Sequence, residues 1–349
     1  MIDLDRLTAN IDEMADAMRA RGVALRPHAK THQTIAIAQR QLASGAVGLT
    51  CATLAEAEVF ADSGMPDIFI AVPMHGGPAR QRQLRLLHER SRLRVGVDSE
   101  PGAEWLSAAG DRFAEPLEVL VEVDAGYGRT GVPVESVGRI ADAAARLGLG
   151  VVGAFTHAGH AYDNPGLEAI HAAADSEESR LGAALAELLR HGHEAIVASA
   201  GSTPTALRSA RGSVTEERPG SYVFGDRRLL MLGVMQPERL SLYVIATVIS
   251  TSVAGQFVLD SGSKALGSVG AGFAPGYGLV PKYGGCVERI DEHHAMVTCA
   301  GPRPRVGDVV LVVPNSASYA LALSPETLVM RKGKIIDRWR VGRVSGPEG

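Results

Sequence analysis

Short runs of apolar and β-branched residues alternate with longer amphipathic segments from about residue 20 to residue 230. The runs that we interpret as strands are residues 23–26, 47–51, 68–72, 93–97, 117–123, 151–156 and 195–198. Helical patterns lie between them, such as residues 31–43, 54–62, 78–90, 134–146 and 167–189. This alternation indicates βαβ units and a parallel sheet. Seven or eight units in roughly 200 residues is the count of a (β/α)8 barrel, although an open doubly wound sheet has the same local pattern.

The pattern changes after residue 230. There, β-rich runs follow one another with Gly and Pro turns and no long helix between them: residues 240–252, 255–258, 294–299, 308–313 and 328–331. Such a shift is typical of a second, all-β domain. We therefore predict an α/β protein in which residues 1–230 form a (β/α)8 TIM-type barrel and residues 231–349 form a β-rich C-terminal domain.

Composition restricts the class of protein. Hydrophobic residues make up 46% and charged residues 21% of the 349 positions, near ordinary globular values. The 35 basic and 39 acidic residues leave a net charge of −4, too small to favour nucleic acid or an anionic membrane surface as a partner. We find no signal-peptide pattern and no apolar stretch near the roughly 20 residues that cross a bilayer. Three cysteines without a CxxC pair or a Cys/His cluster indicate a reducing compartment, so we expect a cytoplasmic protein.

Reactive side chains follow the carboxyl ends of the expected strands, where a barrel builds its active site. Lys30 comes shortly after the first strand, within residues 25–32. A lone loop lysine is most often solvated. A lysine that serves as a Schiff-base nucleophile needs a lowered pKa, which desolvation or neighbouring positive charge provides. Because Arg26, His28 and His32 are candidate sources of that charge, we interpret Lys30 as a nucleophile.

A second polar cluster, residues 198–205, consists of small and hydroxyl-bearing residues between a strand and an expected helix. Backbone N–H groups in such a loop can close around an anion such as phosphate. The same pattern also fits an ordinary N-capped helix start. On the phosphate interpretation, the loop that contains Ser199, Gly201 and Ser202 binds the anion, and Tyr222 adds a phenol to it.

Two further motifs follow expected strands. Residues 123–131 have the glycines of a close-approach loop and one cation, Arg129, but lack the spacing of a dinucleotide fingerprint. Another strand end carries His157, His160 and Tyr162. One such histidine is usually structural, whereas two around a glycine favour chemistry. A lysine, a phosphate-binding loop, an arginine and imidazoles at one barrel mouth are the groups that pyridoxal phosphate requires.

Seven motifs resemble those of the D-threonine aldolase and D-serine dehydratase family. They are residues 26–32, 51–58, 124–131, 157–160, 202–205, 218–222 and 259–266, in the family's order. The resemblance implies an alanine-racemase-like fold, in which a barrel carries pyridoxal 5'-phosphate and a β domain follows it. It also implies a homodimer that acts on a small amino acid.

The resemblance assigns roles to the positions that match these motifs. Lys30 is the Schiff-base lysine, and Arg129 lies near the phenolate oxygen of the cofactor. Gly201, Ser202 and Tyr222 hold the phosphate, and His157, His160 and Tyr162 line the ring and the substrate side. We therefore expect the catalytic residues to be Lys30, His157 and His160, and the residues that bind the cofactor to be Lys30, His28, Arg129, Tyr162, Ser199, Gly201, Ser202 and Tyr222.

One segment departs from the family pattern. In the segment that resembles residues 313–318, the family carries a His and, two residues later, a Cys or Asp; these bind zinc or manganese, which holds the substrate's β-hydroxyl. Here the two positions are Ser316 and Ser318. A neutral serine hydroxyl is a poor ligand beside imidazole, thiolate or carboxylate. We therefore predict that the usual divalent metal is not held at these positions.

Three functions remain open from the sequence. The first is a pyridoxal-phosphate-dependent lyase that acts on a β-hydroxylated D-amino acid by aldol cleavage or dehydration. The second is a metal-free amino-acid racemase, with Lys30 as one base. The third is a non-catalytic carrier of pyridoxal phosphate, against which the second domain argues, since single-domain carriers consist of the barrel alone.

Overall fold

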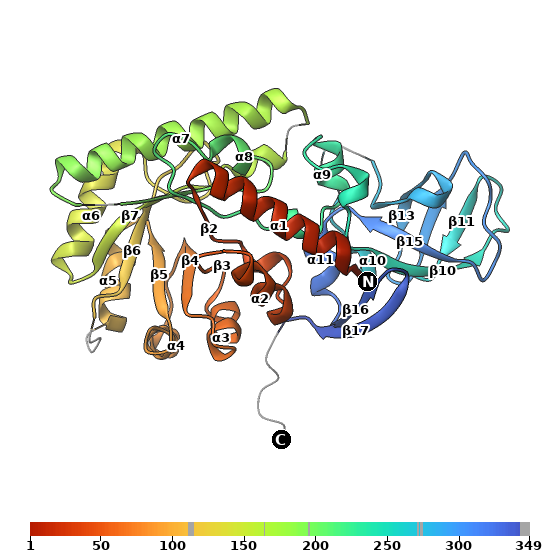
Figure 1. Cartoon of the computed structure of the whole chain (residues 1–349), viewed down its shortest axis with the longest axis horizontal. Helices are drawn as coiled ribbons and strands as arrows, with labels where there is room; N and C mark the ends of the chain where they lie inside the picture. Colours follow the sequence, from red (N-terminus) through yellow and green to blue (C-terminus); the bar gives the residue numbers. More distant parts are fainter. Residues whose placement is uncertain (111–114, 164, 195, 271, 273–274, 343–349) are drawn as a thin grey trace, which may run out of the picture.

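The computed structural model describes residues 1–349 except 111–114, 164, 195, 271, 273–274 and 343–349. Its larger part is built around a curled sheet of eight parallel strands (Figure 1). They are β2 (Ala24–Leu25), β3 (Leu49–Cys51), β4 (Asp67–Pro73), β5 (Arg92–Val97), β6 (Glu118–Glu122), β7 (Gly150–Phe155), β8 (Val197–Ala200) and β9 (Glu216–Glu217). Their order is β2-β9-β8-β7-β6-β5-β4-β3, and a parallel bridge between His28 and Thr50 joins the two edges. The expected TIM-type sheet is confirmed.

Helices cover the outer face of this sheet, as Figure 1 shows. They are α1 (Leu4–Arg21), α2 (Ile35–Ala43), α3 (Leu54–Asp62), α4 (Pro78–His88), α5 (Glu100–Gly110), α6 (Val137–Arg146) and α7 (Leu167–Arg190). The side chain of Thr53 caps α3 by accepting a hydrogen bond from the Glu56 N–H at 3.1 Å. Pro78 opens α4, where a missing N–H costs no helical hydrogen bond.

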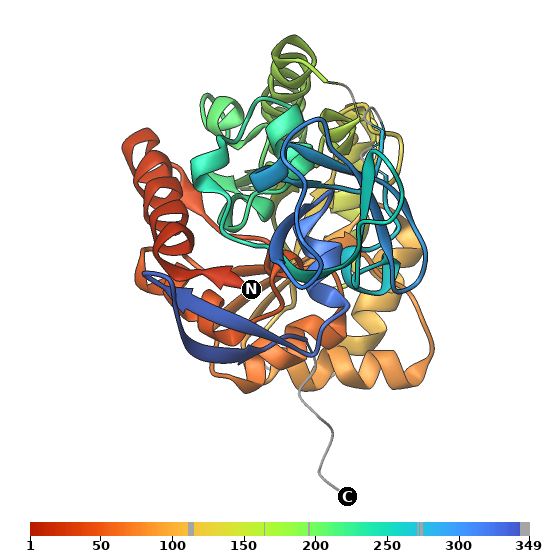
Figure 2. The ribbon, with the colours of Figure 1, turned by 90° about the vertical axis from the view of Figure 1, so that its right-hand side faces the viewer.

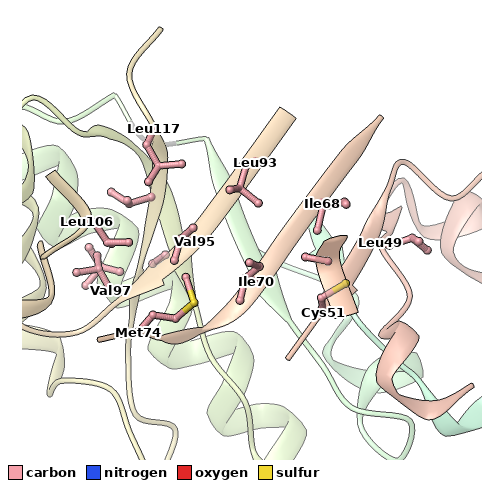
Figure 3. Packing of buried hydrophobic residues seen from close by; sticks show 14 of the residues in the cluster. Leu49, Cys51, Ile68, Ile70, Met74, Leu93, Val95, Val97, Leu106 and Leu117 are labelled. Atoms are coloured by element: carbon pink, nitrogen blue, oxygen red, sulfur yellow. The ribbon is translucent and has the colours of Figure 1, made fainter. Parts of the chain in front are cut away.

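The main hydrophobic core lies between the sheet and these helices. Leu93, Val95 and Val97 of β5 point to this side and are essentially buried (Figure 3). Because strand side chains alternate between faces, the residues between them point into the barrel. Two of the inward side chains, Phe69 and Phe155, meet edge to face with ring centroids 5.1 Å apart.

Charged residues complete the interior of the barrel. Arg26 is 1% exposed, and its guanidinium donates to Asp67 Oδ1 and to Glu216 Oε2, both at 2.6 Å. Arg94 approaches Glu216 Oε2 at 3.6 Å. Glu216 belongs to β9, which the sequence analysis did not predict because this strand consists of two glutamates. Seven strands of the sheet were predicted; the eighth, β9, pairs with β2 and β8, and its Glu216 lies in buried ionic contacts.

The C-terminal part contains a closed antiparallel barrel, which confirms the expected all-β region. Its strands, in order around the barrel, are β10 (Val244–Ser250), β11 (Gln256–Leu259), β14 (Ala295–Thr298), β13 (Gly285–Ile290), β12 (Gly278–Val280) and β15 (Val309–Pro314). Short helices lie before, within and after it: α8 (Ala206–Ser209), α9 (Arg227–Met231), α10 (Ser263–Leu266) and α11 (Ala317–Ala322). Strands β12 and β13 were not predicted.

A small sheet connects the two ends of the chain. Strand β1 (Ile2–Asp3) pairs in parallel with β16 (Glu326–Arg331), which pairs with β17 (Lys334–Arg340). Figure 2 shows the N-terminal strand beside this C-terminal hairpin. The proposed division at residue 230 stays a prediction, and β1 pairs across it.

No helix in the described part of the chain is both long and apolar enough to span a bilayer.

Replacement of Arg26 by Met should destabilise the protein by about 3–5 kcal/mol, because it removes the hydrogen-bonded cation from the buried carboxylate of Glu216 and from the partly buried carboxylate of Asp67. The matched control is Arg90→Met, which removes an arginine that pairs with Asp62 at 2.5 Å, where both side chains are about 42–43% exposed. The control should cost less than about 1 kcal/mol. Urea unfolding of the purified variants measures both values, and equal losses would contradict the interpretation.

Candidate active site

The segments that follow β2, β6, β7, β8 and β9 meet at one end of the barrel, because the carboxyl ends of parallel strands lie together. Three of them contain 3-10 turns: Ala29–Thr31, Gly159–Tyr162 and Ser221–Val223. The charge of Arg129 lowers the pKa of Lys30, and the charges of Lys30 and Arg129 lower the pKa of His157. These three predicted residues therefore share one site. His28 also lies within the electrostatic reach of Lys30 and His157.

Lys30 lies in the open mouth of the barrel. Partial burial lowers the pKa of its amine, Arg129 and Arg218 lower it further, and Glu56 opposes part of that shift. A lower pKa increases the fraction of free amine near neutral pH, as a nucleophilic lysine requires. Lys30 is also the barrel's lysine by elimination, since the other four lysines of the chain lie at positions 264, 282, 332 and 334.

Close backbone contact fixes the turn that carries Lys30. The His28 N–H donates to the Pro219 carbonyl at 3.0 Å. A Cβ at Gly220 would lie only 2.5 Å from Thr31 Oγ1, so this position accepts only glycine without rearrangement. The segment after β9 therefore supports the lysine turn directly.

The loop after β8 forms a small cup lined by backbone and hydroxyl groups. Gly201 has a φ of +107°, which L-residues rarely adopt. The Ser202 N–H donates to Thr205 Oγ1 at 3.1 Å, and the two hydroxyl oxygens are 3.0 Å apart. Thr203 Oγ1 accepts from the backbone N–H of Tyr222 at 3.1 Å, which joins this loop to the segment after β9.

Two predicted cofactor contacts have their hydroxyl groups engaged elsewhere. Ser199 is fully buried; its Oγ donates to Glu216 Oε1 and accepts from Arg218 Nη1, both at 2.6 Å. The Tyr222 hydroxyl accepts from Gln41 Nε2 at 2.9 Å, and burial raises the pKa of this phenol. Their roles toward the cofactor stay predictions, and their backbone places both beside the cup.

His157 is held as a neutral imidazole. Its Nδ1 lies 3.4 Å from the Gly201 carbonyl, a contact in which this nitrogen carries the hydrogen. Burial, and then the charges of Lys30, Arg218 and Arg129, lower its pKa to about 3. The Nε2 lone pair is therefore available on the other side of the ring.

Tyr127 was not identified from the sequence, yet it lies between the two predicted histidines. Its ring centroid is 6.0 Å from that of His157 and 6.3 Å from that of His160. The guanidinium of Arg129 lies over the same ring at 5.3 Å. A Cβ at Gly159 would lie 2.4 Å from the ring. The glycine between the two histidines was the sequence signal for this contact.

Asp124 shapes the loop that carries Tyr127 and Arg129. Its Oδ1 accepts backbone hydrogen bonds from Gly126 at 3.0 Å, Tyr127 at 3.0 Å and Gly128 at 3.1 Å. Three donors on one carboxylate oxygen hold the loop without a regular element. The motif was predicted as a close-approach loop, and its fixed cation does reach the site.

Tyr162 and His160 complete the rim. The phenol of Tyr162 reaches Thr203 and Ser221 at the cup, and burial raises its pKa to about 12. The Nδ1 atoms of His160 and of His28 are buried without a hydrogen-bond partner among the described residues. Such orphaned nitrogens leave capacity for a bound polar group.

Arg218 is a second residue that sequence reasoning missed. It is 4% exposed, donates to the Thr156 carbonyl at 2.6 Å, and lies over the rings of Phe69 and Phe155 at 5.7 and 5.5 Å. The sequence did contain a signal for Arg218, because this residue comes directly before the Pro-Gly turn of the motif at residues 218–222. This cation closes the floor of the site.

The C-terminal part contributes the segment that contains Ser316 and Ser318. The Ser318 hydroxyl lies 3.5 Å from the Lys30 carbonyl. Asp226 Oδ2 accepts from the Ala317 N–H at 3.2 Å, which ties this segment to α9. Within the described ranges, no group of three or more His, Cys, Asp or Glu side chains is arranged to hold a metal ion.

These groups fit pyridoxal phosphate. The lysine amine suits an aldehyde, the cup of small residues suits a phosphate, and the cations Arg129 and Arg218 suit the negative charge of a phenolate. The Nδ1 atoms of His28 and His160 can bond a further polar group.

Residues 2–228 match the family described as "Alanine racemase, N-terminal domain", and residues 241–330 match the "Putative serine dehydratase domain".

The chain belongs to this family of fold-type III pyridoxal-phosphate enzymes. It is 40% identical over 276 residues to D-threo-3-hydroxyaspartate dehydratase of Delftia sp. strain HT23, which covers 76% of this chain and 71% of that protein. It is 31% identical over 349 residues to D-threonine aldolase of Arthrobacter sp., with 98% and 90% covered. A cysteine-to-alanine variant of D-threo-3-hydroxyaspartate dehydratase in the metal-free form superposes with a TM-score of 0.90 at 32% identity, covering 99% of this chain and 96% of that chain.

The comparisons confirm the family resemblance found in the motifs. The relatives are pyridoxal-phosphate-dependent lyases that act on D-amino acids. The metal-free variant shows that this fold forms without a metal ion in a relative.

Replacement of Gly201 by Ala should weaken the binding of pyridoxal phosphate by about tenfold or more, because overpacking costs about 1–3 kcal/mol. A Cβ there would lie 1.9 Å from Glu217 Oε2. The matched control is Gly192→Ala, at a φ of +83° but with nothing within 4 Å of the added Cβ. Titration of the cofactor by absorbance should show a loss only for Gly201→Ala, and equal affinity in both variants would contradict this account of the cup.

Proposed function

We propose that this protein is a pyridoxal-phosphate-dependent lyase that acts on a β-hydroxylated D-amino acid by aldol cleavage or dehydration. The observation that carries the proposal is the Lys30 amine, which is solvent-accessible, has a lowered pKa and lies at the same barrel mouth as the cup of small and hydroxyl-bearing residues. The names of the relatives, a dehydratase and an aldolase of hydroxylated D-amino acids, supply the substrate class.

Each residue of the site has a role in this proposal. Lys30 would hold the cofactor through its amine, the group that an aldehyde requires, and the cup around Gly201 and Ser202 would hold its phosphate. Arg129, which approaches Lys30, would bind the phenolate side. Bound pyridoxal phosphate supplies an electron sink for the charge that develops at the substrate's Cα. Lys30 is then placed to move the proton at Cα.

His157 is the group that we assign to the β-hydroxyl. Its unprotonated Nε2 can accept the hydroxyl proton, as aldol cleavage requires. The low pKa keeps the ring neutral throughout the physiological range. Dehydration instead requires a proton donor to the leaving oxygen, so the products distinguish the two reactions: glycine and an aldehyde for cleavage, or a 2-oxo acid and ammonia for dehydration.

We further propose that the reaction proceeds without a divalent metal at Ser316 and Ser318. The Ser318 hydroxyl reaches the carbonyl of Lys30, so this segment lies at the site even though its side chains are neutral oxygen donors. His157 and His160 would then provide the polarisation of the β-hydroxyl that a metal ion gives in other lyases.

The surface supports a homodimer as the working form. Strands β10 and β15 carry an outward apolar strip in which Ile245 pairs with Leu311, and Ile249 and Val309 are exposed on the same two strands. Val309 is 61% exposed. An exposed apolar strip of this kind is typical of an interaction surface, and we propose a second copy of the chain as its partner. Three free thiols, Cys51, Cys286 and Cys299, support a reducing, cytoplasmic location.

Borohydride reduction of the protein loaded with pyridoxal phosphate should fix a pyridoxyl group on Lys30, detected by peptide mass spectrometry. Lys30→Ala should abolish the label and lower kcat by about 10²–10⁴-fold. Lys264→Ala, at an exposed lysine paired with Glu292, is the control and should leave both unchanged. A label on any other lysine would remove the proposal.

Activity on D-threonine, D-serine or D-threo-3-hydroxyaspartate should survive dialysis against a chelator with kcat/KM unchanged within about twofold, because no metal has to be replaced. Product analysis identifies the reaction. A loss that added zinc or manganese reverses would contradict the metal-free proposal.

The matched variant for this experiment is Ser316→His combined with Ser318→Cys. It should bind zinc, because imidazole and thiolate are its preferred ligands, and its activity should become sensitive to chelator. Solvent deuterium at Cα without fragmentation of any substrate would instead identify a racemase.

A further inference from the structure

The long helix α7 sends one carboxylate into the site from outside the barrel. Glu177 is fully buried, and its Oε1 accepts backbone hydrogen bonds from Ala158 at 2.9 Å and from Gly201 at 3.3 Å. Ala158 follows His157 after β7, and Gly201 lies in the cup after β8. One oxygen atom therefore holds two strand ends that carry different parts of the site.

A second carboxylate lies against the same glycine. Glu217 of β9 is fully buried, and its Oε1 accepts from Ser209 Oγ at 2.7 Å. Its Oε2 lies 1.9 Å from the place of a Cβ on Gly201. Both Glu177 Oε2 and Glu217 Oε2 are buried without a hydrogen-bond partner among the described residues. Two such oxygens beside one peptide are expensive unless a proton lies between them.

The charges around the pair show that one proton is needed. Arg218 is the cation that faces Glu177 and Glu217, and it also faces Glu122 and Glu216. Glu216 is also matched by Arg26 and Arg94, and Glu122 by Arg129, whereas Glu177 and Glu217 share the charge of Arg218. One cation beside two buried carboxylates leaves one negative charge for a proton to neutralise.

The proton belongs to Glu217. Burial, and then the charge of Glu177, raises the pKa of Glu217 well above its ordinary value. Burial also raises the pKa of Glu177, but hydrogen bonds from Ala158, Thr205 and Gly201 favour its ionised form. Glu177 accepts several hydrogen bonds that stabilise its negative charge, whereas Glu217 accepts none from the backbone of the described residues. The proton shared by the two side chains therefore stays on Glu217.

We propose that Glu217 is a neutral carboxylic acid that donates its proton to the Glu177 carboxylate, and that this pair is a positioning device for the cofactor cup and for His157. The link is the backbone of Gly201: its N–H donates to Glu177, and its carbonyl lies at Nδ1 of His157. Loss of the shared proton would place two adjacent anions behind this peptide and displace both halves of the site. The proposal rests on the proposed function only where cofactor affinity is the readout.

Infrared spectroscopy of the native holoenzyme tests the proton directly. At about pH 9, Glu122 and Asp226 are ionised, because their pKa values are about 7 and about 6. A carboxylic acid C=O band that persists at this pH and disappears in Glu217→Gln is the expected result. Its absence from the native protein would overturn the proposal whichever reaction the enzyme performs.

Variants test the positioning role. Glu217→Gln keeps a neutral donor toward Glu177, so its dissociation constant for pyridoxal phosphate should stay within about threefold of the native value. Glu217→Leu removes the donor and should raise that constant at least about tenfold. In the native enzyme, affinity should fall at alkaline pH as the pair loses its proton, and this fall should be missing in Glu217→Gln.

Glu187→Gln is the matched control. Glu187 is buried on the same helix but forms ion pairs with Arg190 and His191, away from the cup. It should lower stability without changing cofactor affinity or the alkaline profile. Equal losses of affinity in Glu217→Gln and Glu217→Leu would contradict a shared proton, because a purely steric role does not distinguish an amide donor from an apolar side chain of similar size.

Discussion

The position of Arg26 between Asp67 and Glu216 is the interaction on which the rest of the barrel depends. A parallel sheet of this kind needs an eighth strand beside the first, and here that strand consists of two glutamates. The burial of Glu216 is tolerable because Arg26, which follows β2, and Arg94 of β5 meet it inside the barrel. Since β9 leads directly into the turn that supports Lys30, the same charges that close the sheet also fix the site.

Hydrogen bonds between backbone N–H groups and two carboxylates hold the barrel mouth in shape. Asp124 gathers three N–H groups of its own loop, and Glu177 joins the loops after β7 and β8. Gly159 and Gly220 allow a ring and a neighbouring turn to approach more closely than any Cβ would permit. Side chains such as His157 are then oriented by loops that these hydrogen bonds hold in place.

The sequence predicted those strands whose buried residues are apolar, because their hydrophobic pattern is visible along the chain. The seven apolar strands were predicted, and so was the gathering of Lys30, Arg129 and His157, because all follow parallel strands. Strand β9 was missed since its buried residues are charged, and β17 since most of its residues are exposed. Tyr127, Glu177 and Arg218 depend on contacts across loops and helices that no local pattern contains.

The pairing of β1 with β16 links the order of synthesis to the order of folding. Ile2 finds its β-partner, Val329, only after both large units between them exist. Contacts of such long range form late, because the entropy of closing the intervening loop must be overcome first. A ribosome-bound chain can thus form its barrel before β16 has been synthesised, and the pairing of β1 with β16 follows as a later step.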